Sequence, residues 1–137
     1  MPIQYAVAPG TVVLCDYSTG FRPPEMVKRR PAVMVSPRLP HRDRLCTVIP
    51  LSGSPPLRDV PYQCRIELLE PLPPPFAESV WWAKADMLAT VSFDRLDLFR
   101  TARDRETGRR RYLHPKVTAE DFKRMQECVL HALGITR

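Results

Sequence analysis

Five side chains with the chemistry to cleave a phosphodiester bond stand beside short apolar runs of the chain. They are two acids, two cations and one hydroxyl: Glu25, Asp86, Arg30, Lys84 and Ser52. RNA cleavage without a metal needs a base for the 2′-hydroxyl proton, a cation for the pentacoordinate phosphorane and an acid for the leaving 5′-oxygen. Arginine suits the second role, because its planar fork grips phosphate oxygens and keeps its charge. From spacing alone, a purely structural role for this set stays open.

Two central strands are expected between residues 31 and 52. The run 31–35, Pro-Ala-Val-Met-Val, has no polar residue on either face, which is typical of a strand buried on both sides. A proline is tolerated at its first position, where the missing N–H costs nothing. Residues 47–49 repeat the pattern and lead to Ser52. Arg30 is therefore expected at the mouth of one buried strand, and Ser52 at the end of the next.

Further strands are expected at residues 11–17, 62–68 and 79–86, and a short extended piece at 88–91. The 62–68 run alternates strictly between apolar and polar residues. The 79–86 run, as a strand, places Trp82, Lys84 and Asp86 on one face. Residues 18–27 form a loop with Gly20, Pro23 and Pro24, and this loop carries Arg22 and Glu25.

A basic hairpin and a helix complete the chain. Between Arg100 and Lys116 stand seven basic and two acidic residues, an excess of five in a chain of net charge +6. Residues 106–108 are expected to form its tip and 111–113 its return strand. Thr118 caps a helix with Asp121 at the third position. The expected apolar stripe, which Gly134 ends, consists of Phe122, Met125, Val129, Leu130 and Leu133.

Composition predicts one globular domain over residues 1–137, with 44% hydrophobic residues. Sixteen prolines between short apolar runs favour a small barrel or sandwich. The charge favours a polyanionic or an acidic partner, or only a basic surface. Four cysteines without CxxC spacing are interpreted as reduced core residues. No metal-ligand spacing, phosphate loop, membrane span or signal peptide is found, so we expect no metal, no cofactor, no membrane contact and a cytoplasmic location.

The motifs resemble the MazF/PemK toxin family over most of the chain. The similarity lies in Glu25-x4-Arg30-Pro31 with the apolar run that follows, and in Val48-x-Pro50-Leu51-Ser52. Gly10-x5-Asp16, Ala85-Asp86-x3-Thr90-Val91 and Arg95-Leu96 match as well. The resemblance implies a mainly β fold with a C-terminal helix, namely a small SH3-like barrel of the MazF/PemK/CcdB type that forms a homodimer.

The resemblance also implies a metal-independent, sequence-selective endoribonuclease that cleaves single-stranded RNA through a 2′,3′-cyclic phosphate and is neutralised by an acidic antitoxin. Arg30 and Ser52 correspond to its main catalytic groups and Glu25 to the loop acid, while Lys84 and Asp86 match the cation and acid of the PemK/Kid branch. Further RNA contacts are assigned to side chains near the site and on the hairpin: Arg22, Lys28, Arg29, Trp82, Arg109, Arg110 and Arg111.

Three departures from the family pattern bear on activity. Ser52 stands where the hydroxyl residue is usually Thr, Lys84 stands where the cation is often Arg, and no histidine occurs in the first loop. The identity of the general base therefore stays open. Two other functions also stay open: a non-catalytic member of the same fold that binds a protein target, in the manner of a gyrase poison, and a basic nucleic-acid-binding regulator that uses the hairpin. Trp82 could stack on a base or pack in the core or at a dimer interface.

Overall fold

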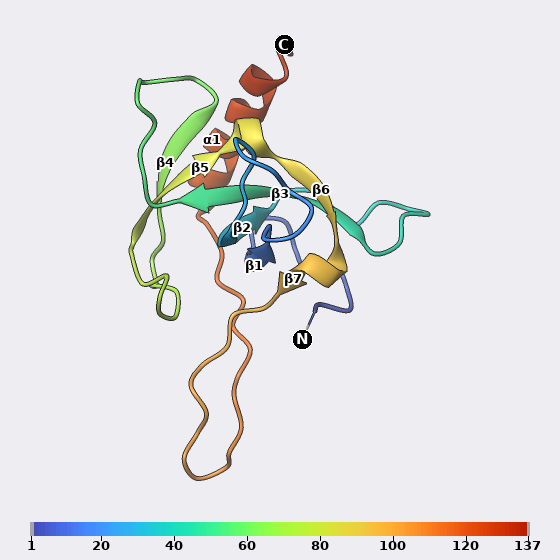
Figure 1. Cartoon of the computed structure of the whole chain (residues 1–137), viewed down its shortest axis with the longest axis vertical. Helices are drawn as coiled ribbons and strands as arrows, with labels where there is room; N and C mark the ends of the chain where they lie inside the picture. The colour runs from blue at the N-terminus through green and yellow to red at the C-terminus, as the bar shows by residue number, and fades with distance from the viewer. Residues whose placement is uncertain (1, 137) are drawn as a thin grey trace.

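Seven short strands form one antiparallel sheet in the computed structural model, which describes residues 2–136 (Figure 1). The strand order is β4-β5-β3-β2-β1-β7, and β6 pairs with β3 off this path. The strands are β1 Val12–Asp16, β2 Arg29–Met34, β3 Leu45–Ser52, β4 Gln63–Glu67, β5 Val80–Lys84, β6 Ala89–Ser92 and β7 Leu96–Asp97. Two 3-10 turns, η1 Ala85–Met87 and η2 Phe93–Arg95, flank β6, and the helix α1 spans Ala119–Ala132.

The two central strands, β2 and β3, are buried on both faces, as their sequence predicts. Val33 and Ile49 belong to one core cluster, on the side of α1, which also holds Met125. Ala32 and Val48 belong to a second cluster on the opposite side of the sheet. Because successive side chains of a strand point to opposite faces, an uninterrupted apolar run serves two cores at once. The predicted burial of this run is confirmed.

The helix α1 begins where its sequence predicts. The Oγ1 of Thr118 accepts a hydrogen bond of 3.1 Å from the backbone N–H of Asp121, which satisfies one of the free donors of the first turn. Met125 and Cys128 are buried against the sheet. The predicted stripe is wrong at its end, because Leu133 lies beyond the helix and is 57% exposed. The chain leaves the helix through Gly134 at φ +68°, a conformation that favours glycine.

The strand expected at residues 79–86 is shorter in the structure. β5 ends at Lys84, and the chain then turns into η1. Asp86 therefore does not continue the strand face that carries Trp82 and Lys84, and that part of the sequence prediction is wrong. The turn expected at residues 92–96 is confirmed as η2, where the hydroxyl of Ser92 accepts from the N–H of Asp94 at 3.1 Å.

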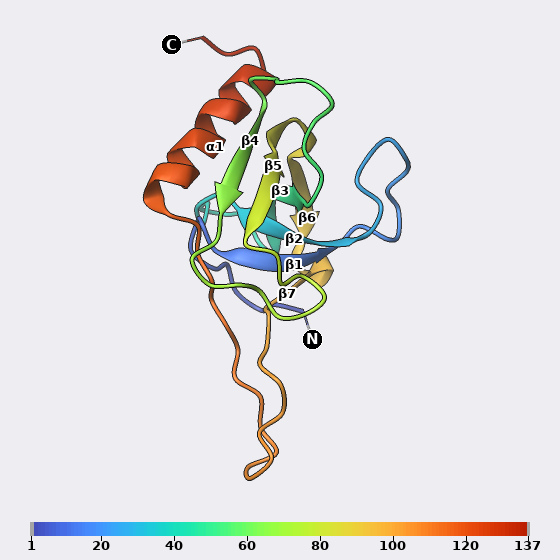
Figure 2. The same cartoon turned by 90° about the vertical axis from the view of Figure 1, so that its left-hand side faces the viewer.

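Residues 100–116, here called the arginine arm, form a long loop whose two extended halves run side by side away from the sheet (Figures 1 and 2). The arm is held by Leu113 N–H to Phe99 C=O at 2.7 Å and Thr101 N–H to Arg111 C=O at 2.9 Å. Its strand-like pairing is limited to isolated bridges, one between Arg100 and Tyr112 and one between Lys116 and Thr11. The return strand expected at 111–113 is wrong, because six charged residues at 103–106 and 109–110 cross the tip with no apolar face to bury.

The four cysteines are buried and unpaired, as predicted. Burial raises the pKa of Cys46 to about 11 and that of Cys64 to about 12, so neither is a thiolate near neutral pH. No group of three or more His, Cys, Asp or Glu residues suited to a metal ion occurs within residues 2–136. Over the same residues, no helix is long and apolar enough to cross a membrane.

Candidate functional site

Arg30 and Ser52 lie on the neighbouring strands β2 and β3. The register pairs Ala32 with Pro50, and continuing the same antiparallel pairing by two residues brings Arg30 opposite Ser52 on one face of the sheet. Ser52 is paired in turn with Trp82 of β5, and Trp82 with Arg65 of β4. A row of four side chains, which we call the Arg30–Ser52 row, thus crosses four strands on one face.

Ser52 and Arg30, two neighbouring members of this row, differ in how their polar atoms are satisfied. The Oγ of Ser52, a residue only 6% exposed, accepts the N–H of Ser54 at 3.2 Å and keeps its own proton for another acceptor. The Nε of Arg30 is buried and has no hydrogen-bond partner within residues 2–136. A buried donor left without an acceptor is costly. Ser52 thus keeps a free proton, and Arg30 keeps one donor without an acceptor among the described residues.

A third group, Gln63, links the remaining two candidates. It is paired with Lys84 across β4 and β5. Its Oε1 accepts from the Nζ of Lys84 at 3.3 Å, and its Nε2 donates to the Oδ1 of Asp86 at 3.1 Å. This amide bridge holds the cation and the acid at a fixed separation although they belong to different elements. The turn at η1, which removed Asp86 from the strand face, is what brings its carboxylate to Gln63.

Gln63 is the site residue that sequence reasoning missed. In the sequence it is one outward-facing member of an alternating strand, and only the β4–β5 register reveals its neighbour. The bridge borders a hollow of about 430 Å³ whose other walls come from the β3–β4 loop, including Pro56, Leu57 and Tyr62. Leu57 is fully exposed at this rim.

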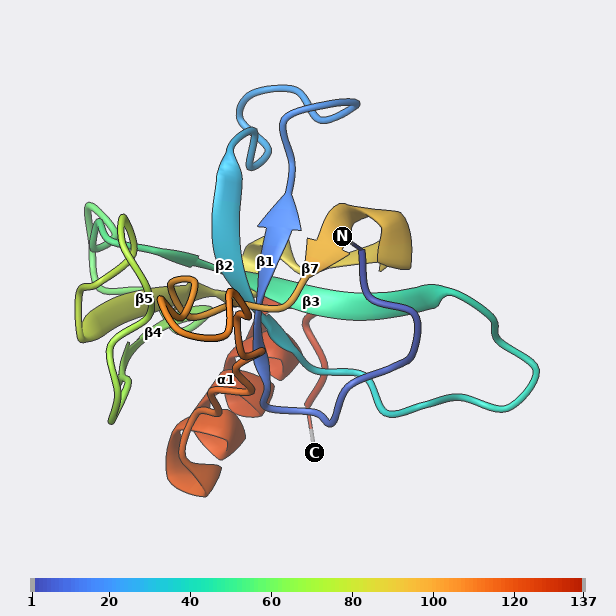
Figure 3. The same cartoon turned by 90° about the horizontal axis from the view of Figure 1, so that it is seen from below.

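Glu25 and Arg22 lie on the β1–β2 loop, residues 17–28, which projects from the sheet (Figure 3). The Oε1 of Glu25 accepts the N–H of Arg22 at 3.1 Å, which closes a local turn. In the described chain no hydrogen bond or ion pair joins Glu25 to the other four candidates. The structure therefore places Arg30 and Ser52 on neighbouring strands, links Lys84 to Asp86 through Gln63, and leaves the loop acid outside both pairs.

Asp16, at the end of β1, has a structural contact. Its carboxylate accepts the hydroxyl and the N–H of Ser18, and these hydrogen bonds lower the pKa of Asp16. The guanidinium of Arg95 donates to the carbonyls of Asp16 at 3.1 Å and Thr19 at 2.7 Å. Asp16 and Arg95 thus fix the base of the loop that carries Glu25.

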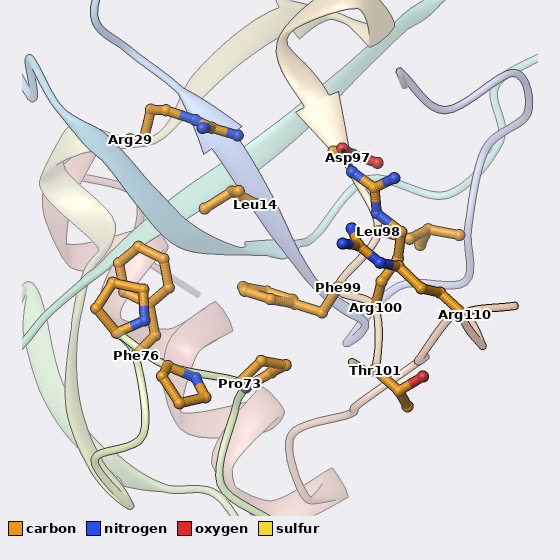
Figure 4. A pocket seen from close by; sticks show the side chains of 12 residues that line it. Leu14, Arg29, Pro73, Phe76, Asp97, Leu98, Phe99, Arg100, Thr101 and Arg110 are labelled. Atoms are coloured by element: carbon orange, nitrogen blue, oxygen red, sulfur yellow. Dashed lines mark hydrogen bonds and ion pairs between the residues drawn. The ribbon is translucent and has the colours of Figure 1, made fainter. Parts of the chain in front are cut away.

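The residues assigned to RNA contact are divided between the two faces of the sheet. Trp82 is half-buried and stands outside both core clusters, so its place is at the surface of the Arg30–Ser52 row rather than in the core. Arg29, opposite Asp16 on β1, points to the other face and lines a separate pocket together with Arg110 (Figure 4). Lys28 ends the β1–β2 loop, and its carbonyl accepts the N–H of Tyr17 at 3.3 Å. Arg109 and Arg111 are exposed on the arginine arm.

A mainly β fold with one C-terminal helix, carrying a basic and hydroxyl-bearing row, is the class that this structure defines. The sequence profile of a family described as PemK-like, MazF-like toxins of type II toxin–antitoxin systems matches residues 8–130. The chain belongs to this family, and the predicted fold class is confirmed.

Solved structures with the same fold are distant in sequence. One is an endoribonuclease from a mycobacterial species in complex with its cognate antitoxin, with 21% identity, a TM-score of 0.64 and coverage of 96% of this chain and 99% of that one. The Mycobacterium tuberculosis toxin MazF-mt6 has 14% identity and a TM-score of 0.59, covering 93% and 99%. MazF from Deinococcus radiodurans has 18% identity and a TM-score of 0.60, covering 96% and 99%. Comparison with curated proteins finds no significant match.

Proposed function

We propose that this chain is a metal-independent, sequence-selective endoribonuclease toxin that cleaves single-stranded RNA, leaving a 2′,3′-cyclic phosphate and a 5′-hydroxyl. The observation that carries the proposal is the Arg30–Ser52 row. It places an arginine whose buried Nε has no partner and a hydroxyl whose proton is free on neighbouring strands. A phosphate bound at this row would meet positive charge and a hydroxyl donor, and the extra charge of a phosphorane would be held more tightly than that of the substrate.

Lys84 adds a second positive charge near the same face, held by Gln63. An ammonium is a point charge without a bidentate fork, so its effect depends on where it is held. The Gln63 bridge supplies this restraint at 3.3 Å from the Nζ. We assign Gln63 as a positioning residue for Lys84 and Asp86.

The proton transfers fall to Glu25 and Asp86, the two acids of the set. Asp86 is held by the amide bridge, and the carboxylate of Glu25 accepts the N–H of Arg22 on its own loop. The pH–rate profiles of Glu25→Gln and Asp86→Asn assign the roles. Loss of the acidic limb marks the general base, and loss of the basic limb marks the general acid.

RNA binding would use Trp82 for base stacking and Arg22, Lys28, Arg29, Arg109, Arg110 and Arg111 for phosphates. Besides RNA, an acidic antitoxin is expected as a protein partner, from the family and from the antitoxin complex among the structural relatives. A homodimer follows from the family alone, and light scattering of the purified protein tests it.

The experiment that tests the proposal uses purified protein and a long single-stranded RNA in the presence of EDTA, with Arg30→Ala beside it. We expect cleavage by the wild type and none by the variant, with ends that are 2′,3′-cyclic phosphate and 5′-hydroxyl. Activity that disappears in EDTA and returns with Mg²⁺ or Mn²⁺ would refute the mechanism. RNA binding without any cleavage would favour a non-catalytic member of the fold that acts through the arginine arm.

A further inference from the structure

Arg95, in the turn η2, lies far along the sequence from the β1–β2 loop but beside the start of that loop in space. It is followed by Leu96, which is buried and pairs with Cys15 of β1. Continuing this antiparallel register by one residue places Arg95 opposite Asp16, where β1 ends and the loop begins (Figure 3). The position of Arg95 is thus set by a buried neighbour on a paired strand.

Three contacts link Arg95 to the first part of the loop. Its Nη1 donates to the carbonyl of Asp16 at 3.1 Å and to that of Thr19 at 2.7 Å. Its guanidinium also lies over the ring of Phe21, 4.8 Å from the centroid, where a cation is attracted to an aromatic face. Phe21 in turn meets the buried Tyr17 edge-to-face, with centroids 5.2 Å apart. One side chain from η2 therefore holds both the backbone and an aromatic ring of the loop.

The loop approaches the guanidinium most closely at Gly20. This residue has φ +82°, and a Cβ added to it would lie 3.0 Å from the Nη2 of Arg95. A side chain at this position would therefore displace the arginine or the loop, in addition to the strain of the positive φ. The contact between loop and arginine depends on glycine here.

The held part of the loop leads directly to Glu25. The other described hydrogen bonds of the loop, Arg22 N–H to the Oε1 of Glu25 at 3.1 Å and Tyr17 N–H to the carbonyl of Lys28 at 3.3 Å, join loop residues to one another. The contacts of Arg95 link the loop to a different element. A loop released from such contacts samples more conformations, and ordering it again costs entropy.

We propose that Arg95 is a positioning residue for the proposed cleavage. By holding residues 16–21 it limits the conformations of the β1–β2 loop, and so increases the fraction of molecules in which Glu25 can meet RNA bound at the Arg30–Ser52 row. Arg95 itself touches neither RNA nor the reacting atoms in this role. The inference rests on the proposed function, in which Glu25 transfers a proton.

A double-mutant cycle between Arg95 and Glu25 tests the role, with single-turnover cleavage measured at saturating RNA. Arg95→Gln should lower the rate about tenfold, the equivalent of one hydrogen bond to a charged group. Arg95→Lys keeps the charge without the fork and should lower it less. In the Glu25→Gln background, Arg95→Gln should cost less than about twofold more, because the acid that it positions is already gone. Circular dichroism verifies folding, and RNA affinity should not change.

Two glycines provide a matched control that leaves Arg95 in place. Gly20 and Gly108 both have positive φ, but a Cβ at Gly108 would meet nothing within 4 Å. Gly20→Ala should lower the rate about threefold to tenfold, whereas Gly108→Ala should change it less than about twofold. This pair decides the question if Arg95→Gln does not fold.

Backbone ¹⁵N relaxation measures the restraint without RNA. We expect the order parameters of Thr19, Phe21 and Glu25 to fall in Arg95→Gln. The proposal is overturned by unchanged order parameters, by equal effects of the two glycine variants, by an Arg95→Gln loss that is the same with and without Glu25, or by a Glu25→Gln variant as active as the wild type. A wild type that does not cleave RNA refutes the proposed function and the positioning role with it. A wild type that cleaves no faster than Arg95→Gln refutes the positioning role alone.

Discussion

Arg29 and Arg30 are adjacent in the chain, carry the same charge and meet different chemistry on the two faces of β2. Arg30 stands in a polar row beside Ser52, with its Nε buried and unpartnered. Arg29 lies at the edge of an apolar pocket, with its neighbours Leu14 and Phe99. Strand alternation alone separates the two environments. The comparison shows that a basic run before a buried strand is not one patch but two.

The two faces also differ in what a bound anion would gain. On the Arg30 face a guanidinium group and a hydroxyl lie on neighbouring buried strands, and donors aimed at developing charge are what stabilisation of a transition state requires. On the Arg29 face the charges surround an apolar hollow and one of them is already paired with Asp97. That arrangement suits docking, where apolar burial supplies affinity and charge supplies selection.

The sharpest test of this division compares Arg30→Ala with Arg29→Ala. Removing one oriented donor to a transition state typically costs about 10²–10³ in rate, so Arg30→Ala should lose cleavage to that extent. At saturating RNA, Arg29→Ala should keep the rate within about threefold of wild type, because its side chain points to the other face and a phosphate contact there would affect only RNA affinity. Single-turnover cleavage of a defined RNA, with circular dichroism to verify folding, gives both values. Equal losses would show that the faces are not functionally separate.

Ser52 allows a narrower test on the same face. Ser52→Ala removes the hydroxyl and should lower the rate of cleavage by about 10²-fold, as for the loss of another transition-state donor. Ser52→Thr keeps the donor, and its β-branched side chain has fewer rotamers, so its rate should match or exceed that of the wild type. An inactive Ser52→Thr variant that is folded would mean that the space around this 6%-exposed side chain, and not its hydroxyl, limits activity.

The Gln63 bridge should have an intermediate effect. Gln63→Leu leaves Lys84 and Asp86 unheld and should lower kcat about tenfold, the equivalent of one hydrogen bond to a charged group. Gln63→Glu keeps a contact to Lys84 but places a second carboxylate beside Asp86, which raises a carboxyl pKa and moves the acidic limb of the pH–rate profile upward. Glu67→Gln on the same strand is the control. An unmoved profile in Gln63→Glu would reduce Gln63 to a structural role.

The sequence predicted secondary structure correctly where a residue pattern is compatible with only one type of element. The apolar run 31–35 had to be a buried strand, and Thr118 with Asp121 had to start a helix, so β2, β3 and the beginning of α1 were predicted correctly. The prediction failed where the same residue pattern is compatible with two types of element. The residues after Lys84 alternate like a strand but turn into η1, because the pairing of β5 with β3 and β4 ends there.

The site residues show the same difference between what the sequence predicts and what it misses. Arg30 and Ser52 could be paired from the sequence because both are anchored to buried strands. Gln63 could not be found, since its role exists only through a cross-strand neighbour twenty-one residues away. The opposite directions of Arg29 and Arg30 follow from alternation, but the pocket that receives Arg29 is built from the proline loop and the arm, whose positions no local pattern determines.

The smallest expected effect on the chemical step comes from the arginine arm. Neutralising Arg109, Arg110 and Arg111 together should weaken RNA affinity and flatten its salt dependence by up to about 2 in the slope of log K against log salt, because each phosphate contact on a single strand contributes about 0.7. The cleavage motif and the rate at saturating RNA should stay the same, since phosphate contacts carry no sequence information and the arm lies away from the Arg30–Ser52 row. Filter binding at several salt concentrations and mapping of cleavage ends measure the two quantities. An unchanged slope would show that the arm does not touch RNA. Its charge would then serve the acidic antitoxin expected from the family, or only solubility, and slower antitoxin binding by the triple variant at low salt would distinguish the two.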